Sequence, residues 1–428
     1  MFFSHINITK TKLSLSFSLL IFAVLHIPKP GRGDGEARRR REKLSVAEIE
    51  TLDRISQLPD ALLVQILSLL PAKDAFTTCL LSKRWHFLWT FVYNLIFTQE
   101  SYRVFYEPRD ENCSLKIEKF VSFVNHVLNG FVSSKITKFE LDAPQLFNYT
   151  SQIKRWLSFA VEKEVKHVVF LSSYTHACVL PESFCNCSSL ITLYLRQCCF
   201  NDAVIVWKFL KSLKLESVIL KDDEILNLLS GCPALERMEL DDVGGFRCLK
   251  INSSKFKRLN LKNHRLPHDI SDRSLEIYAP YLEHLEISGD LGDLECRLVD
   301  VSLRLSSKLD NYFCDFEENN TDLQSWISSI VFPNLKNITI VNSILVCLNR
   351  QKRKRGFRRL VKLSQLLLKN ATILKKFLII SKSRRCKKCK KCLRNCGFNF
   401  FFGLLDKLYP SGSSANAKII FQDQVFRD

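Results

Sequence analysis

A short apolar pattern recurs along the middle of the chain and constrains the fold more than any other feature. The pattern is apolar-x-x-apolar-x-apolar, and its copies begin at Ile136, Val165, Leu190, Leu210, Leu235, Phe256, Leu282 and Leu335. Successive copies start 20 to 29 residues apart, except for a last gap of 53 that is about two repeats long. Alternation of the last two apolar positions places them on one face of a β-strand. One such unit cannot bury its own apolar side, so the pattern predicts stacked units that share a continuous core and form a solenoid.

The net charge is concentrated in one segment. The chain has 63 Lys and Arg against 44 Asp and Glu, a formal charge of +19. Residues 350–394 hold 19 Lys or Arg and no Asp or Glu, so the other 383 residues are neutral overall. The charge therefore bears on localisation or a secondary contact, and it does not predict a basic surface over the whole protein.

Residues 53–97 have the pattern of three short helices. Pro59 suits a first helical turn, because its missing N–H has no helical partner there. A wide apolar stripe follows, made of Leu62, Leu63, Ile66, Leu67 and Leu70, and Pro71 ends the helix. A second helix is expected from Asp74 to about Leu81, and a third with Trp85, Leu88 and Trp89 on one face. So small a unit needs a partner to cover its apolar face.

These residues resemble the F-box motif in the form common in plants. The resemblance rests on Leu58-Pro59-Asp60, Ile66-Leu67, Leu70-Pro71, Asp74-Ala75, Leu81-Ser82-Lys83-Arg84-Trp85 and Leu88-Trp89. It implies docking onto a Skp-type adaptor, which bridges to the cullin scaffold of an SCF-type ubiquitin ligase. By position it assigns adaptor binding to Leu58, Pro59, Leu62, Ile66, Leu70, Pro71, Trp85, Leu88 and Trp89. Trp85, Leu88 and Trp89 are also expected to pack the join to the next domain, and Leu63, Leu67 and Leu81 to hold the helices together.

The repeats resemble the irregular leucine-rich repeats of plant F-box proteins, both in period and in turns such as Leu229-Ser230-Gly231-Cys232-Pro233. Polar positions between the strand leucines are expected on the exposed face of the sheet, the default substrate-binding surface of a solenoid. They are Thr192, Tyr194, Lys214, Glu239, Asn260 and Glu286. For any single one of them, an ordinary solvated position is the simpler interpretation.

Residues 331–428 resemble the FBD domain that often follows such repeats in plants. The match rests on Leu367-Leu368, Asn370-Ala371, Leu374, Phe377 and Ile379, with a closing Ser-rich turn before Ile419 and Phe421. A helix is expected over residues 360–371, with strands over 374–380 and 417–421. The basic residues between these elements depart from the family pattern.

Two motifs lie in the basic segment. Cys386, Cys389, Cys392 and Cys396 have a spacing known from iron–sulfur and zinc sites, but an exposed basic loop with incidental cysteines is the simpler interpretation, so no metal or cofactor is assigned. Lys352, Arg353, Lys354 and Arg355 resemble a nuclear-import signal. Phosphate contacts with nucleic acid and a solvated charged loop are the alternatives.

The N-terminal residues 1–50 are interpreted as a disordered or leader segment. Residues 13–27 are apolar and follow Lys10 and Lys12, as in a signal peptide. The stretch is short for a membrane span, and no small-x-small cleavage site follows it. A targeting or membrane role is the alternative, while the 16 Cys, too few for a disulfide scaffold, fit a reducing compartment.

Together these features predict an α/β protein with four parts. After residues 1–50 come a three-helix F-box at 51–97, an irregular leucine-rich-repeat solenoid at 98–330 and a small α+β FBD-like domain at 331–428. No phosphate-binding loop, HExxH or GxSxG motif occurs, and the nine His are scattered, so no catalytic role is expected.

We expect a substrate-recognition subunit of an SCF-type ubiquitin ligase, located in the nucleus, the cytoplasm or both. Its partners would be a Skp-type adaptor, through it a cullin, and a protein substrate that the sequence does not identify. The alternative is a nucleic-acid-associated or nuclear protein that acts through the C-terminal basic segment. Membrane contact is not expected.

Overall fold

The computed structural model describes residues 55, 58–98, 113–142, 146, 148–172, 177–200, 203–263, 274–289, 295–298, 333–342, 360–361, 363–365, 367–368, 371–384 and 418–426. The predicted leader at residues 1–50, the candidate import signal Lys352 to Arg355 and the cluster Cys386, Cys389, Cys392 and Cys396 lie outside these residues. The chain divides into two compact units, Met1–Pro59 and Asp60–Asp428. Within the described residues, no helix has the length and apolar character that a membrane crossing requires.

The second compact unit begins at Asp60 with a group of short helices, which we call the helical unit. It contains α4 (Asp60–Leu67), α5 (Ala72–Thr77) and the two 3-10 helices η1 (Thr78–Leu80) and η2 (Trp85–Phe91). Leu63 and Leu67 are fully buried, as their proposed packing role requires. The expectation for Leu81 was wrong, because this residue lies just beyond η1 and its side chain is 50% exposed. The third predicted helix is a 3-10 helix, a form common in short segments.

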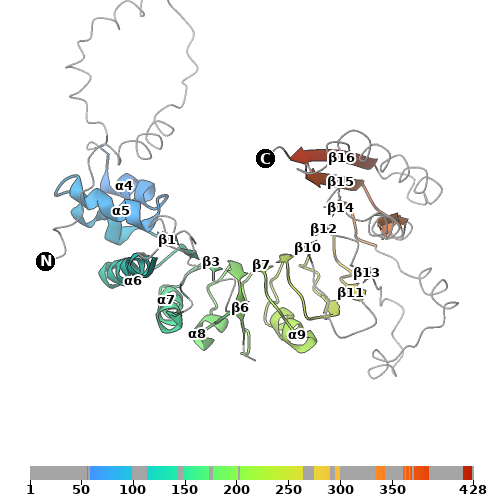
Figure 1. Ribbon diagram of the computed structural model, residues 1–428, viewed down its shortest axis with the longest axis horizontal. Coiled ribbons are helices and arrows are strands. Elements are labelled where there is room, and N and C mark those ends of the chain that lie inside the picture. The colour runs from blue at the N-terminus through green and yellow to red at the C-terminus, as the bar shows by residue number, and fades with distance from the viewer. Residues whose placement is uncertain are drawn as a thin grey trace, which may run out of the picture. The chain divides into compact units, whose positions relative to one another are not determined.

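Among the described residues after the helical unit, the main element is a parallel sheet of 11 strands (Figure 1). In spatial order the strands are β1 (Asn94–Thr98), β2 (Lys138–Asp142), β3 (His167–Leu171), β5 (Thr192–Arg196), β7 (Ser212–Glu216), β8 (Arg237–Asp241), β10 (Arg258–Lys262), β12 (His284–Gly289), β14 (Asn337–Asn342), β15 (Lys376–Arg384) and β16 (Lys418–Phe426). The predicted fold class, a helical unit followed by a solenoid-like repeat, is confirmed.

Helices connect the first strands of this sheet and lie along one side of the row of strands (Figure 1). They are α6 (Cys113–Gly130), α7 (Thr150–Glu162), α8 (Glu182–Cys185) and α9 (Asp222–Ser230). Two small parallel sheets complete the array. One joins β9 (Cys248–Lys250), β11 (Ser274–Tyr278) and β13 (Glu295–Leu298), and the other joins β4 (Cys178–Val179) and β6 (Cys198–Cys199).

The core of the sheet consists of two rows of apolar side chains, one from each inward-facing strand position. One row runs through Leu95, Phe139, Val168, Leu193, Leu213, Met238, Leu259, Leu285, Ile338 and Phe377, and every member is at most 2% exposed. The second row, from Phe97 to Ile379, is equally buried. From β2 to β14, these rows are the last two apolar positions of the repeat pattern, so the predicted alternation is confirmed.

The strands on either side of the last gap in the pattern are direct neighbours in the large sheet. β12 pairs directly with β14, with His284 opposite Asn337, so no further strand stands between them. β13, which falls in the gap, pairs with β11 in a small sheet instead.

The strands at residues 331–428 continue the same sheet. β14 pairs with β15 and β15 with β16, all parallel and in register. Phe377 and Ile379 are fully buried in the two core rows. Among the described residues, strand pairing therefore continues from β12 into β14, β15 and β16, and the boundary at residue 330 stays a prediction.

A residue with a left-handed backbone conformation follows each of four successive strands of the large sheet. Gln197, Ser217, Asp242 and Asn263 have φ between 49° and 56°, a region that non-glycine residues seldom occupy. Each donates its backbone N–H to a carbonyl of the next strand, for example Asp242 to Lys262 at 2.8 Å. These bonds extend the ladder one residue past each strand and fix where each repeat turns.

Candidate functional site

The helical unit exposes several large apolar side chains. Leu62 is 44% exposed and Leu69 62% exposed, and Leu80, Leu81, Phe87 and Phe91 are each at least half exposed. All six lie within residues 62–91. Surface leucines and phenylalanines are ordinary when scattered, but such a concentration in one small unit is typical of a protein-binding surface.

The residues predicted to bind an adaptor differ in accessibility. Pro59 and Leu62 are exposed, and Leu58, Ile66 and Pro71 are half-buried. Leu70, Trp85, Leu88 and Trp89 are at most 8% exposed, so their side chains lie inside the protein. Adaptor contact stays a prediction for all nine. The accessible candidates that the sequence missed are Leu69, Leu80, Phe87 and Phe91, all of which lie outside the helical stripe used to find the others.

Trp89 lies at the join between the helical unit and α6. Its ring meets Phe76 edge-on at a centroid distance of 5.1 Å and stacks on His126 of α6 at 6.2 Å. A Cβ added at Gly130, the last residue of α6, would lie 2.7 Å from the Trp89 ring. This close packing matches the role predicted for Trp89 as a joining residue.

Hydrogen bonds fix the same join on the strand side. The backbone N–H of Tyr93 donates to the hydroxyl of buried Ser68 at 3.2 Å, and the side-chain amide of Asn94 donates to the Ser68 carbonyl at 2.9 Å. Val132 donates its N–H to the Thr90 carbonyl at 3.2 Å. The helical unit is therefore held directly against the first strand of the array.

The predicted polar positions lie on the exposed face of the sheet, and Lys214 contacts two others among them, Glu239 and Tyr194. Glu239 accepts a hydrogen bond from Lys262 at 2.9 Å and pairs with Lys214 at 3.2 Å. The Lys214 amine also lies 4.3 Å from the centre of the Tyr194 ring, a cation–π contact. Burial alone would raise the pKa of Glu239, but the two lysines outweigh it and lower that pKa below its ordinary value. This part of the face is charge-compensated.

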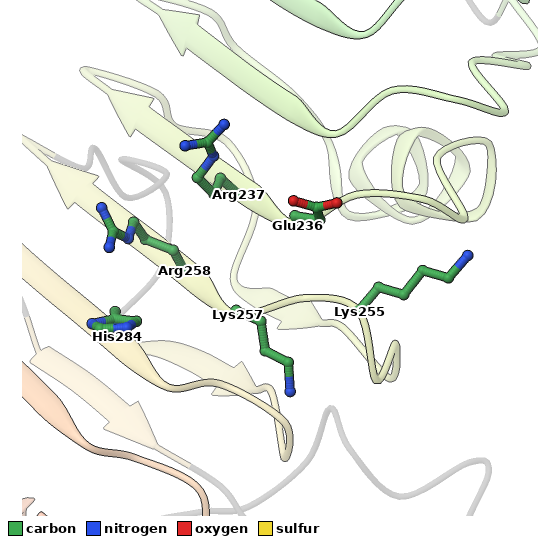
Figure 2. A pocket seen from close by; sticks show the side chains of 6 residues that line it. All are labelled: Glu236, Arg237, Lys255, Lys257, Arg258 and His284. Carbon is green, nitrogen blue, oxygen red and sulfur yellow. The ribbon is translucent and has the colours of Figure 1, made fainter.

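An open hollow of about 420 Å³ lies at the start of strands β8, β10 and β12. Its lining residues, shown in Figure 2, are Glu236, Arg237, Lys255, Lys257, Arg258 and His284. We call it the basic hollow. The sequence contains a pattern that predicts this cluster of basic residues: Arg237, Arg258 and His284 each occupy the first position of a strand.

The described residues include no group of three or more His, Cys, Asp or Glu side chains placed to hold a metal ion. Several cysteines there are buried core residues, among them Cys198 and Cys232. Burial raises the pKa of the Cys232 thiol to about 12, which keeps it protonated and unreactive. Cys79 and Cys199 are only half-buried.

Two family models match the chain. The F-box domain matches residues 55–97, which hold the helical unit and most of β1. The model described as FBD-associated F-box protein At5g56370, LRR repeats, matches residues 153–310, which include the basic hollow.

Whole proteins of Arabidopsis thaliana match as well. F-box/LRR-repeat protein At3g26922 is 36% identical over 248 residues, which cover 55% of this chain and 75% of that protein. F-box/FBD/LRR-repeat protein At4g00160 is 34% identical over 270 residues, which cover 60% of this chain and 55% of that protein. The chain spans about half the length of several such relatives, 52 to 57%. From its two domain matches and these relatives, the chain belongs to the plant family of F-box/FBD/LRR-repeat proteins.

Proposed function

We propose that this protein is a substrate-recognition subunit of an SCF-type ubiquitin ligase. In this role the helical unit binds a Skp-type adaptor, the adaptor bridges to a cullin, and the repeat array binds a protein substrate. The observation that supports it most is the group of apolar side chains exposed within residues 62–91. A unit of this size gains stability and solubility when a partner covers such side chains.

The chain would contribute position rather than catalysis. The helical unit, which would bind the adaptor, is attached directly to the array, which would bind the substrate. Trp89 packs on α6, and Asn94 of β1 donates a hydrogen bond to the carbonyl of Ser68. A substrate held by the array is thereby kept at a high effective concentration near the ubiquitin donor. The ubiquitin-transfer chemistry would belong to the other subunits.

The experiment is a binding measurement between the full chain and a purified plant Skp-type adaptor. We expect Pro59→Ala combined with Leu62→Ala to weaken binding about tenfold, because both side chains are accessible and the apolar area they lose corresponds to a loss of about 1.4 kcal/mol of binding free energy. Leu226→Ala is the matched control: Leu226, on α9, is 47% exposed, close to the 44% of Leu62. Absence of adaptor binding by the wild-type chain, or equal losses in both variants, would contradict the proposal.

We also propose a location in the nucleus, the cytoplasm or both, with Lys352 to Arg355 as the import signal. A fluorescent fusion whose nuclear signal falls when these four residues are changed to alanine would support it. An unchanged distribution would assign the basic run no import role.

A competing function is nucleic-acid binding through residues 350–394, which carry 19 Lys or Arg and no acidic residue. It requires RNA or DNA affinity that falls steeply with salt and disappears when this segment is deleted. Salt-insensitive or absent binding would leave the ligase role as the only candidate.

A further inference from the structure

Three side chains of the basic hollow form one row across neighbouring strands. Arg237 of β8 is paired with Arg258 of β10, and Arg258 with His284 of β12. Adjacent strands are about 4.8 Å apart, so the row spans about 10 Å. Figure 2 shows both guanidinium groups pointing to the same side, while the Lys257 amine points away from them.

Three acidic residues near this row, Glu236, Glu239 and Glu283, are bound to other cations. Glu236 pairs with Lys211 at 3.1 Å. Glu283 contacts Lys257 at 3.2 Å and Lys336 at 2.8 Å. Glu239, two residues after Arg237 on the same face of β8, forms ion pairs with Lys214 and Lys262.

Two arginines are therefore left facing solvent. Within the described part of the chain, Arg237, Arg258 and Lys255 form no ion pair, and all three are exposed. Like charges on directly opposed strand positions destabilise a sheet. Placing Arg237 opposite Arg258 thus works against folding, and an anion bound between them would remove that repulsion.

The positions that flank the row are neutral. Ser212 precedes Arg237 on β7, and Asn337 follows His284 on β14. His284 and Asn337 separate the two arginines from the next cations at this strand position, Lys376 of β15 and Lys418 of β16. The adjacent pair Arg237 and Arg258 therefore suits a short segment with few anionic groups, whereas nucleic-acid affinity depends on a longer series of phosphate contacts.

His284 differs from the arginines. Burial, with the nearby Arg258 charge, lowers its pKa below the ordinary value, so the imidazole is neutral near pH 7. Its Nδ1 atom lies 3.1 Å from the side-chain amide nitrogen of Asn337. The neutral His284 ring therefore offers hydrogen bonding at one end of the row. The positive charge of the row comes from Arg237 and Arg258.

We propose that the basic hollow binds an acidic segment of the protein substrate, whose carboxylates or phosphate group are held by Arg237 and Arg258. The inference deepens the proposed function and rests on it for the identity of the ligand as a substrate. The planar guanidinium matches both anions, because each offers two oxygens to its parallel N–H donors. The hollow thus defines a substrate class by charge: segments in which acidic or phosphorylated residues are adjacent.

The test measures fluorescence anisotropy of short labelled Gly/Ser peptides with the full chain at physiological salt. One peptide carries three consecutive Glu, a second carries one phosphoserine and a third carries Gln in place of Glu. The hollow variant is Arg237→Gln with Arg258→Gln. The matched control is Lys166→Gln with Lys208→Gln, which removes the same charge from two exposed lysines that form no ion pair among the described residues. Circular dichroism verifies that both variants fold.

We expect the hollow variant to weaken binding of at least one anionic peptide about five- to tenfold, as for two partly solvated ion pairs, and the control variant less than about twofold. The anionic peptide that binds with the higher affinity shows whether the hollow prefers carboxylate or phosphate groups. Equal losses in the two variants, or equal binding of the Gln peptide, would overturn the proposal. So would a short oligothymidylate that loses more affinity in the hollow variant than either peptide does.

Adaptor binding separates this proposal from the proposed function. The hollow variant should bind the Skp-type adaptor as the wild-type chain does, because the hollow lies on β8 to β12 and the exposed apolar side chains lie within residues 62–91. If the wild-type chain binds no adaptor but the peptide differences hold, the ligase role fails and the anion site stands. If adaptor binds and the peptide differences are absent, the site alone fails.

Discussion

Replacing Gly231 with alanine changes the stability of the fold in two opposite ways, through local backbone preference and through packing between repeats. Gly231, just after α9, has φ −74° and ψ −8°, a helical conformation that alanine adopts without strain. Considered alone, this backbone favours the substitution by about 0.4–1 kcal/mol, because alanine has less conformational freedom in the unfolded chain. A measured increase in stability would mean that local propensity decides the outcome.

The neighbouring repeat reverses the expected sign. An added Cβ would lie 2.1 Å from the carbonyl oxygen of Ile205 and 2.7 Å from its carbonyl carbon, so one of the two backbones has to move. The backbone N–H of Trp207 donates to the Gly231 carbonyl at 2.9 Å, and that movement pulls the bond apart. A buried bond left unmade costs about 1–3 kcal/mol, and overpacking costs about 1–3 kcal/mol more. After the backbone gain is subtracted, we expect a net loss of about 1–5.6 kcal/mol.

Urea unfolding followed by tryptophan fluorescence measures this loss, since Trp207 is fully buried beside the substitution. A loss of about 2.8 kcal/mol would lower the folded-to-unfolded ratio about a hundredfold. Ser230→Ala, at an exposed position one residue earlier, is the control and should change stability by less than about 0.5 kcal/mol. A urea midpoint for Gly231→Ala at or above the wild-type midpoint would refute the reasoning.

Three further outcomes follow from packing and charge. Trp89→Ala removes the ring that joins Phe76 to α6; it should cost about 3–5 kcal/mol and speed amide hydrogen exchange in α6 more than in α9. Glu239 has a lowered pKa, so its charged form stabilises the fold above the ordinary value of 4.5, and this contribution is lost as the pH falls through the folded pKa. The wild-type urea midpoint should therefore drop more steeply than that of Glu239→Gln below that pH. Cys232, whose pKa burial raises to about 12, should resist iodoacetamide until urea unfolds the chain, as mass spectrometry would detect.

The repeat pattern predicted the core of the array position by position. Phe139, Leu193 and Leu259 occupy the same place in three copies, and all are at most 2% exposed. This works because each repeat contacts only its neighbours, so alternation within one unit specifies which side chains the next unit covers. The helical unit was also visible in the sequence: of the three residues expected to hold its helices together, Leu63 and Leu67 are fully buried and Leu81 is exposed.

Features that depend on pairing between distant segments were not predictable in this way. The direct pairing of β12 with β14 followed from no local pattern, because spacing alone does not reveal whether an intervening segment joins the sheet. Exposure of Leu81 and burial of Leu70 likewise depend on tertiary packing, which the helical periodicity does not specify.

The sequence by itself determined the order of the parts and the inward face of each strand, since both depend on local periodicity and on recurring motifs. Only the tertiary structure decided which charges remain without a partner. Glu236 and Glu283 directly precede Arg237 and His284 in the chain, yet Glu236 binds Lys211, and Glu283 binds Lys257 and Lys336. Arg237 and Arg258 are thereby left side by side and exposed, because strand register, which aligns residues 21 positions apart in the chain, selects the neighbours of each charge.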